Sequence, residues 1–598
     1  MPENTPTYQE RVSSLRKEIS AEGLDGYIIP CTDEFQGEFL ASYAQRLGWI
    51  SGFTGSAGSA VILPEQAVVM SDGRYTLQLR EQVDTMLFDL KNSTKTSVGE
   101  WLDEHAPEGS LIGYDVWLYT PKQIETIEKD CTEKSIILKP CKRGLIDAVW
   151  FDQSARPQGK VSLFPDDIAG RSAADKCDEL AAQIKEKGAA ACLLAAGDSI
   201  CWLLNVRGSD IDYSPLCLSY ALLHDDGTVD WFIDPTKVTK EVISKLGERI
   251  CVFGLEALQG RLAKIGKGRE DATLLLDRSA TPIRFEQIVK AAGISILDVP
   301  DPCVLPKAIK TKSERNALRA AHIEDGVALT RFLKWIDENQ NSDVKMDELS
   351  VEEKLEQFRQ QGDNYIGPSF PTIAGFADNG AIVHYRANQK TCREIKGDGL
   401  LLVDSGGQYR WGTTDITRTR AIGIPSQEMR ENYTRVLKGH IAVATAIFPK
   451  DTTGIEIDKL ARKALHEVGL DYAHGTGHGV GFNLCVHESS TGIFPSEEKS
   501  FEAGMLVSNE PGYYKEGEYG IRIENLVLVE ESSDKLGYYC FDTVSFAPLD
   551  PKLIVMEMLD KSEKKWLSDY LKKVKDHLQA YLDEEEQAWL SAQISDLV

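Results

Sequence analysis

A weak internal repeat in the first half of the chain is the feature that most limits its possible folds. The pattern Leu15-x3-Ile19-x3-Gly23-x3-Tyr27 recurs, with similar residue types, from Leu180 onward. In both copies a helical pattern ends at a glycine and a short apolar run follows, which is typical of an α/β unit. A Trp-x5-Gly spacing comes next in both copies. The shared order predicts two related α/β domains.

Domain boundaries are expected where Pro, Gly and polar residues cluster. The segment SARPQGK separates the two α/β copies, and VPDPCVLPK precedes a helical pattern that starts at about residue 311. An apolar stripe at helical spacing over residues 562–597 predicts a C-terminal helix packed on its own domain. We therefore expect an N-terminal α/β domain over 1–155, a second, related α/β domain over 156–308, and a larger third domain with a helical C-terminal extension over 309–598.

Charge and composition exclude several classes of partner. Asp and Glu number 93 against 67 Lys and Arg, a formal net charge of −26. This surplus repels phosphate backbones and anionic lipid, so we expect no nucleic-acid or membrane binding, although it also serves simply to keep a large protein soluble. The sequence has no signal-peptide pattern at its start and no apolar run of about 18 residues, and its 12 cysteines form no CxxC pairs. These features predict a cytoplasmic protein.

Two aspartates face each other in a predicted hairpin. The run 400–404 has the pattern of a buried strand that ends at Asp404, and 413–420 alternates like a second strand. If the strands pair about residues 409–410, Asp404 lies opposite Asp415. Like charges at that position are destabilising unless a cation lies between them. The pair alone fits a metal site or two turn residues about equally well.

A second acidic pair follows the same pattern. Reflection about Gly517 brings Glu510 opposite Glu524, and the two-residue period puts Arg522 on the same face as Glu524. A glutamate inside an otherwise apolar strand is costly unless it is compensated. A solvated edge charge is therefore a weak explanation, and this pair favours the metal hypothesis.

The segment HGTGHGVG, residues 474–481, lies between the two acidic hairpins. Two histidines among four glycines are a poor environment for ordinary core histidines, because glycine permits close backbone approach. Carboxylates with one or two imidazoles suit manganese or magnesium better than structural zinc. Four carboxylates are many for one ion, so the residues predict a two-metal site that activates water for hydrolysis.

These motifs resemble those of the pita-bread metallopeptidases. VDSGGQY, TTDITRT, HGTGHGVG, NEPGYY and GIRIEN occur in the order of that group. Over essentially the whole chain, the arrangement is similar to the three-domain cytosolic aminopeptidase P (Xaa-Pro aminopeptidase) family. The resemblance implies two related α/β N-terminal domains followed by a C-terminal pita-bread catalytic domain, hence α/β and α+β classes. It also implies two divalent metal ions per chain, expected to be Mn²⁺, and a homodimer.

The resemblance also implies a role for each candidate residue. Asp404 would hold one ion, His478 and Glu510 the other, and Asp415 and Glu524 would bridge both. Glu510 would also carry a proton from the water to the leaving proline nitrogen. Three further histidines, His384, His474 and His487, would line the site and stabilise the tetrahedral intermediate. Of these, His384 and His487 would also bind the substrate.

Two arginines complete the implied set. Arg74 in SDGRY would contact the substrate, although an arginine after Asp-Gly is nearly as well explained as a turn residue. Arg522 would support the carboxylates. After His487-Glu488 the chain has Ser489-Ser490 where the family usually has Gly-Pro, a departure that concerns the loop and spares all five ligands.

The implied activity is release of the N-terminal residue from peptides with proline in the second position. The preference for proline follows from the resemblance alone. Two alternatives remain at this point: a prolidase, which cuts only dipeptides, and a metal-free pita-bread binding protein. The additional N-terminal domain disfavours the first, and the complete ligand set disfavours the second.

Overall fold

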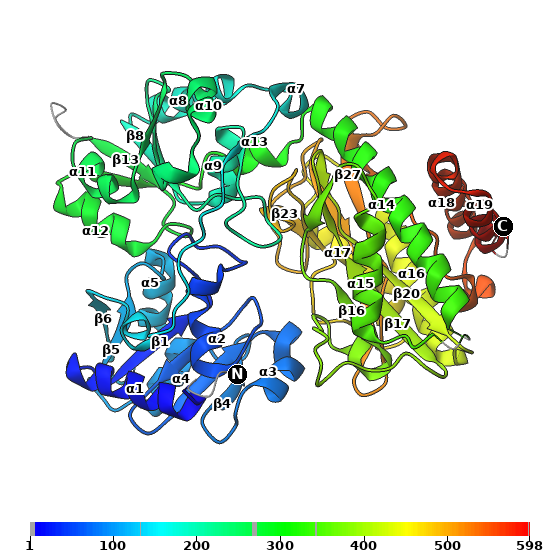
Figure 1. Cartoon of the computed structure of the whole chain (residues 1–598), viewed down its shortest axis with the longest axis horizontal. Coiled ribbons are helices and arrows are strands. Elements are labelled where there is room, and N and C mark those ends of the chain that lie inside the picture. Colours follow the sequence, from blue (N-terminus) through cyan, green and yellow to red (C-terminus); the bar gives the residue numbers. More distant parts are fainter. Residues whose placement is uncertain are drawn as a thin grey trace. The chain divides into compact units, whose positions relative to one another are not determined.

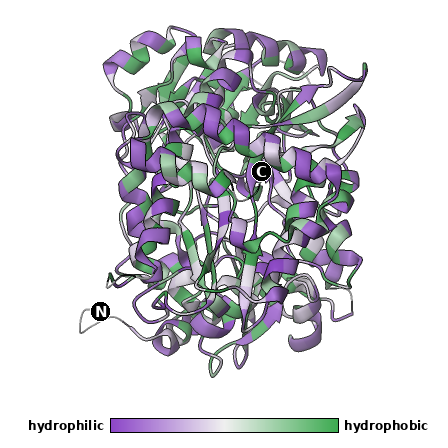
Figure 2. Ribbon diagram, turned by 90° about the vertical axis from the view of Figure 1, so that its right-hand side faces the viewer, coloured by the Kyte–Doolittle hydropathy of each residue, from purple (hydrophilic) through white to green (hydrophobic). Residues whose placement is uncertain are grey.

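The computed structural model describes residues 6–595 and 597, apart from 132, 266–271, 341 and 343. The chain forms two compact units, one of Met1–Asp166 with Arg171–Val304 and one of Asp167–Gly170 with Leu305–Val598 (Figure 1). The residue boundaries of the three expected domains stay predictions. Most helices alternate between hydrophilic and hydrophobic stretches, as expected of helices with one buried face (Figure 2). Among the described helices, none has the length and apolar composition needed to cross a membrane.

The first unit contains two six-stranded sheets with equivalent topology. The strand orders are β4-β3-β2-β1-β5-β6 and β12-β11-β10-β8-β13-β14. In each sheet the first strand of the copy, β1 or β8, pairs antiparallel with β2 or β10 and parallel with β5 or β13. The outer strands pair in parallel in both sheets. This agreement confirms the predicted pair of related α/β folds.

The strands of the first sheet are β1 (Gly26–Pro30), β2 (Ser59–Ile62), β3 (Ala67–Ser71), β4 (Asp89–Asn92), β5 (Leu111–Asp115) and β6 (Ile137–Cys141). Those of the second are β8 (Ala191–Leu194), β10 (Tyr220–His224), β11 (Val229–Phe232), β12 (Ile250–Phe253), β13 (Thr273–Leu276) and β14 (Ser295–Asp298). The helices include α2 (Arg46–Ser51), α3 (Thr76–Gln82), α4 (Val98–His105), α5 (Pro121–Asp130), α6 (Leu145–Val149), α9 (Gly197–Leu203), α10 (Lys240–Leu246), α11 (Leu258–Leu262) and α12 (Ile283–Ala291).

The repeated glycines end the helices that precede the equivalent strands. Helices α1 (Tyr8–Ala21) and α8 (Ala173–Glu186) each begin with a capping box. Gly23 and Gly188 follow them with φ of +66° and +68°. Glycine adopts this left-handed conformation without a steric cost, which explains why both copies keep it.

The second unit is mainly antiparallel and contains all five predicted ligands. Its largest sheet has the order β21-β28-β27-β24-β22-β23, and smaller sheets are β16-β17-β20, β15-β18-β19 and β25-β26. Figure 1 shows α14 to α17 beside these strands. The helix expected from about residue 311 is α14, which starts at a capping box formed by Thr311 and Glu314.

The strands of this unit are β15 (Tyr365–Pro368), β16 (Ile373–Phe376), β17 (Gly399–Ser405), β18 (Gly407–Tyr409), β19 (Gly412–Thr413), β20 (Ile416–Ile422), β21 (Ile447–Pro449), β22 (Gly477–Gly479), β23 (Glu488–Ile493), β24 (Leu506–Asn509), β25 (Gly512–Lys515), β26 (Tyr519–Arg522), β27 (Asn525–Glu531) and β28 (Tyr538–Thr543). Its helices are α14 (Lys312–Asn339), α15 (Glu348–Arg359), α16 (Gln427–Ala444), α17 (Gly454–His466), α18 (Lys561–Leu578) and α19 (Glu584–Ser595).

The first predicted hairpin forms in a different register. Asp404 pairs with Thr417 rather than with Asp415, because the turn lies at residues 410–411 instead of 409–410. The prediction of directly opposed aspartates is therefore wrong by two residues. A shift of two keeps side chains on the same face of a sheet, so the error does not move Asp415 to the far side.

The second hairpin has the predicted register. Gly512 pairs with Arg522 and Asn509 with Asn525, as reflection about residue 517 requires. Gly517 has φ of +75°, a conformation that favours glycine at the turn. Glu510 and Glu524 fall in the interruption between the two pairs of strands.

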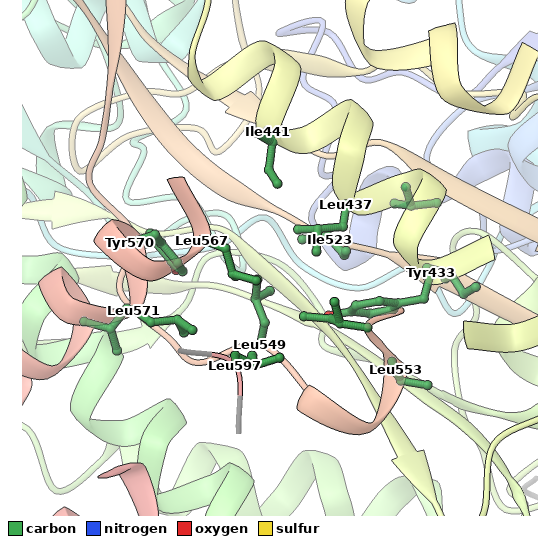
Figure 3. Close-up of a cluster of buried hydrophobic side chains, with 14 of the residues drawn as sticks. Tyr433, Leu437, Ile441, Ile523, Leu549, Leu553, Leu567, Tyr570, Leu571 and Leu597 are labelled. Carbon is green, nitrogen blue, oxygen red and sulfur yellow. The ribbon is translucent and has the colours of Figure 1, made fainter. Parts of the chain in front are cut away.

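The C-terminal stripe forms two helices rather than one. Helix α18 ends at Leu578, and Asp583 starts α19 by accepting a hydrogen bond from the Glu586 backbone N–H at 2.8 Å. The buried side chains Leu567, Tyr570 and Leu571 of α18 lie in one apolar cluster (Figure 3). Other members of this cluster are Tyr433, Leu437, Ile441, Ile523, Leu549 and Leu553. The predicted packing of this extension on its own domain is thus observed.

We expect Leu571→Ala to destabilise the second unit by about 2–5 kcal/mol, since Leu571 is fully buried and its truncation leaves a cavity. The midpoint of urea unfolding, followed by near-UV circular dichroism, measures the loss. Lys572→Ala, on the exposed side of the same helix, is the matched control and should leave the midpoint unchanged. Equal midpoints for both variants would contradict the packing role of α18.

Candidate metal centre

The five predicted ligands are brought together in the second unit, four of them at or next to strand ends. Asp404 lies near the end of β17, and Asp415 precedes β20. His478 is the central residue of β22. Glu510 directly follows β24, and Glu524 lies between β26 and β27. Positions where a strand ends or is interrupted free these side chains to converge.

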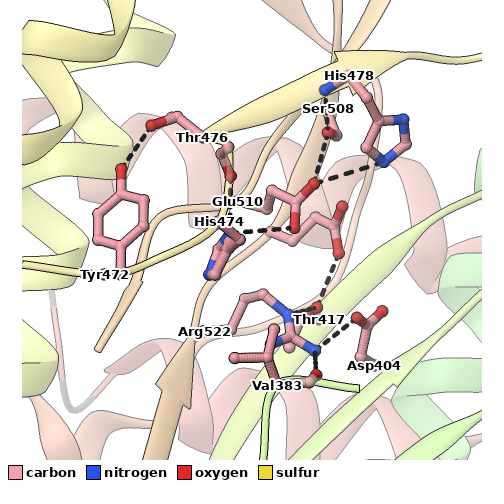
Figure 4. A network of polar contacts seen from close by, with 12 residues as sticks. Val383, Asp404, Thr417, Tyr472, His474, Thr476, His478, Ser508, Glu510 and Arg522 are labelled. Atoms are coloured by element: carbon pink, nitrogen blue, oxygen red, sulfur yellow. Dashed lines mark hydrogen bonds and ion pairs between the residues drawn. The ribbon is translucent and has the colours of Figure 1, made fainter. Parts of the chain in front are cut away.

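The distances place ligand atoms around a common centre. One ligand atom each from Asp415, His478 and Glu524 lies within 4.8 Å of the others. The His478 Nε2 atom is 3.4 Å from Asp415 Oδ2 and 3.4 Å from Glu510 Oε1. Asp404 is close enough to interact electrostatically with Asp415 and Glu510. Figure 4 shows several of these side chains converging.

The electrostatics of the site favour a bound cation. Burial, with the charges of Asp415 and Glu510, outweighs the opposing Arg522 and raises the pKa of Asp404 to about 6. Burial and neighbouring carboxylates also raise the pKa of Glu510, and raise that of Glu524 well above its ordinary value. Asp404 Oδ1 is buried and has no hydrogen-bond partner among the described residues. Four clustered carboxylates with one imidazole fit divalent metal ions, which would take the place of the missing positive charge.

His478 is oriented as a metal ligand. Its Nδ1 atom is 2.9 Å from the Gly479 carbonyl oxygen, so the Nδ1–H donates there and the Nε2 lone pair faces the carboxylates. Burial lowers the pKa of His478, but the hydrogen bond with Asp415 and the charge of Glu510 outweigh it and raise the pKa to about 9. A bound metal would displace that proton and leave the neutral imidazole as ligand.

A polar network holds the carboxylates in place. The Arg522 Nη2 group donates to Asp404 Oδ2 at 2.7 Å, and its Nε donates to Thr417 Oγ1 at 3.2 Å. Thr417 in turn donates to Glu524 Oε2 at 2.7 Å. Arg522 is therefore in contact with one predicted ligand and linked through one hydroxyl to another (Figure 4). This arrangement supports the role proposed for Arg522.

Tyr514 is a site residue that the sequence reasoning missed. Its hydroxyl is 2.5 Å from Arg522 Nη1 and 2.7 Å from His474 Nε2, so it links the arginine to the first histidine of HGTGHGVG. His474 Nδ1 also lies 4.0 Å from Glu510 Oε2. The two-residue period was the available signal, because β25 and β26 put Tyr514 on the same face as Arg522.

Of the other predicted residues, His487 contacts a predicted ligand, and His384 is linked to the site through its neighbour Val383. The His487 ring stands perpendicular to the His478 ring, with centroids 4.3 Å apart. His384 follows Val383, whose carbonyl accepts from Arg522 Nη2 at 3.4 Å. Ser489 and Ser490 continue β23, so the departure from Gly-Pro lies within a paired strand.

Arg74 lies in the first unit, where its contacts agree with the turn alternative. Its backbone N–H and Nε both donate to Asp72 Oδ1, at 3.0 and 2.9 Å, and its Nη2 donates to Asp72 Oδ2 at 2.7 Å. A substrate contact by Arg74 stays a prediction.

Family models match almost the whole chain. Residues 316–531 match metallopeptidase family M24, and 537–597 match the C-terminal region of peptidase M24. Residues 11–148 and 152–314 each match a Creatinase/Prolidase N-terminal domain. These matches, together with the sheet topology, confirm two N-terminal α/β domains ahead of a pita-bread catalytic domain.

Full-length relatives point the same way. The chain is 38% identical to a probable Xaa-Pro aminopeptidase P of Laccaria bicolor, covering 99% of this chain and 94% of the relative. It is 35% identical to a probable Xaa-Pro aminopeptidase P of Paracoccidioides brasiliensis, covering 96% and 97%. A crystal structure of X-prolyl aminopeptidase from Caenorhabditis elegans, described as a cytosolic enzyme with a di-nuclear active site, superposes with a TM-score of 0.93 at 29% identity, covering 99% of this chain and 100% of that one.

Removing one of the crowded carboxylates should stabilise the metal-free protein. Glu524→Gln keeps the size of the side chain and its acceptor for Thr417. The pKa of Glu524 is higher in the folded protein than in the unfolded chain. The carboxyl therefore lowers the free energy of unfolding at every pH above about 4.3, the pKa of an unfolded glutamate. This loss of stability disappears as the pH falls toward about 4.3. We expect the metal-free variant to melt several degrees above metal-free wild type at about pH 7.5, roughly 2–4 °C for each kcal/mol relieved.

The same melting experiment tests metal binding. Added Mn²⁺ should raise the melting temperature of the wild type and leave that of Glu524→Gln nearly unchanged. Glu498→Gln, at an exposed position, is the matched control and should behave like the wild type. A variant that is no more stable without metal, and is still stabilised by Mn²⁺, would show that Glu524 is not part of the centre.

Proposed function

Because the chain belongs to metallopeptidase family M24, we propose that it is a metal-dependent Xaa-Pro aminopeptidase, which releases the N-terminal residue from peptides with proline in the second position. One observation carries this proposal: Asp415, His478 and Glu524 converge within 4.8 Å. They do so in a chain that is 38% identical over nearly its full length to a probable Xaa-Pro aminopeptidase P.

Two divalent metal ions per chain fit the donor set. Asp404 would hold one ion, His478 and Glu510 would hold the other, and Asp415 and Glu524 would be shared between them. Manganese is the proposed metal, because a carboxylate-rich set with one imidazole suits harder divalent ions. When bound, two such ions polarise a carbonyl oxygen and lower the pKa of water toward neutrality.

The residues of the chain supply proton transfer. A water molecule adds to the carbonyl carbon of the first residue and loses a proton to Glu510, whose carboxylate lies beside His478 and His474. Glu510 then gives this proton to the proline nitrogen as the peptide bond breaks. The products are a free amino acid and a peptide that begins with proline.

The surrounding imidazoles orient the substrate. We assign His474, next to Glu510, and His487, edge-on against His478, to orient the substrate and to stabilise the carbonyl oxygen on which negative charge develops. We assign His384 to the same task. The acidic centre favours the positive charge of a free amino terminus, which accounts for cleavage at that end of the peptide.

We further propose that the protein works as a homodimer in the cytoplasm. The cytosolic description of the Caenorhabditis elegans enzyme supports the location, and membership of the family supports the dimer. Sedimentation equilibrium should then give twice the 66.4 kDa mass of the chain. A mass equal to that of one chain at micromolar concentration would overturn the dimer.

Peptide length separates this activity from that of a prolidase. We expect the Mn²⁺-loaded protein to release arginine from Arg-Pro-Pro, chelation to abolish the release, and added Mn²⁺ to restore it, as followed by chromatography of the products. The dipeptide Arg-Pro is the comparison substrate. Cleavage of dipeptides alone would identify a prolidase, and no cleavage of any Xaa-Pro peptide would end the assignment.

Asp415→Ala distinguishes an enzyme from a metal-free binding protein. We expect kcat to fall at least about a thousandfold, because the variant loses a ligand shared by both ions. Metal content, measured by inductively coupled plasma mass spectrometry, should fall with it. Asp451→Ala, an exposed position in the same unit, is the matched control. Full activity in Asp415→Ala would support the binding-protein alternative.

A further inference from the structure

Glu488, the residue directly after His487, is buried between two lysines. Its Oε1 atom is 3.1 Å from Lys307 Nζ and its Oε2 atom 2.5 Å from Lys310 Nζ. The three side chains are only 1–3% exposed. Each carboxylate oxygen of Glu488 is thus bound by a separate ammonium group, and both groups come from one short segment of the chain.

The two lysines are themselves held firmly. Lys307 lies in α13 (Val304–Ala308), and the Lys310 backbone N–H donates to the Gly504 carbonyl at 2.9 Å. Thr311, the next residue, caps α14, and its hydroxyl donates to the Ala169 carbonyl at 3.1 Å. The lysines therefore present a nearly fixed pair of positive charges to Glu488.

Glu488 is also joined by its backbone to the strand that carries a predicted ligand. It pairs with Gly479 across β22 and β23, next to an irregularity in register at His478. On the other side of the peptide bond, the His487 ring contacts the His478 ring, with centroids 4.3 Å apart. The position of the His487 ring thus depends on where Glu488 is anchored.

A buried ion cluster of this kind is weak evidence for added stability. Desolvating three charged groups is costly, and well-packed apolar side chains of similar volume are often at least as stable. Ion pairs fix relative positions, because the buried carboxylate has few other partners of equal energy. The cluster is thus suited to hold one residue in place.

We propose that Glu488 is a positioning residue: clamped by Lys307 and Lys310, it holds the His487 imidazole against His478. The catalytic consequence rests on the proposed function, in which His487 contacts the substrate. The placement of the His487 ring by Glu488 does not rest on the proposed function, because it concerns only where that ring lies.

Kinetics of a double-mutant cycle test the catalytic consequence. Glu488→Gln should lower kcat on Arg-Pro-Pro at least tenfold and change KM less than threefold. In a His487→Ala background the same substitution should lower kcat less than twofold, because the imidazole that Glu488 positions is absent. Glu563→Gln, whose carboxylate pairs with Lys438 at 2.6 Å, is the control for loss of a Glu–Lys pair and should change neither parameter. Equal losses in both backgrounds would overturn the proposal.

Nuclear magnetic resonance of ¹³C-histidine-labelled protein tests the position itself. The His487 ring signal, assigned by its absence in His487→Ala, should shift or broaden in Glu488→Gln and stay in place in Glu563→Gln. If Glu488→Gln does not fold, Lys307→Met, which leaves the Lys310–Glu488 pair intact, should shift the same signal. An unmoved His487 signal in a folded variant overturns the proposal. Failure of the wild type to cleave Xaa-Pro peptides would instead overturn the proposed function. The position of the His487 signal could still be interpreted, because it does not depend on activity.

Discussion

The repulsion among four clustered carboxylates is the constraint on which the catalytic unit depends. Asp404, Asp415 and Glu524 are buried and Glu510 is partly buried. The pKa values of Asp404, Glu510 and Glu524 are raised, with burial as the largest cause. One arginine, Arg522, cannot balance this charge alone. Added cations would relieve this repulsion, and the proposed metal binding and water activation rest on that electrostatic demand.

The rest of the catalytic unit fixes where those charges lie. Strand ends supply the ligands, and hydrogen bonds from Arg522 and Thr417 hold two of the carboxylates. Tyr514 joins that network to His474. Lys307, Lys310 and Glu488 form a separate buried ionic cluster, next in sequence to His487, and we propose that it positions the His487 ring. Polar groups from distant parts of the chain thus share the task of maintaining one arrangement.

Local sequence rules predicted much of this fold and site. The glycine-terminated helices of the repeat and the register about Gly517 follow from backbone conformation, which nearby residues determine. The first hairpin was misplaced by two residues, because a two-residue turn at 410–411 has no glycine or proline to mark it. Tyr514 was missed although the two-residue period of the second hairpin puts it on the face of Arg522. The Lys307–Glu488 pair was missed because residues 181 positions apart leave no local pattern. Likewise, the break between α18 and α19 depends on a single cap at Asp583.

The matching order of the two six-stranded sheets bears on how such a chain arose. Equivalent strands in equivalent positions are what tandem duplication of one segment would produce. All five proposed ligands belong to the other unit, between residues 404 and 524. Divergence between the two sheets of the first unit therefore leaves the proposed metal-binding side chains unchanged.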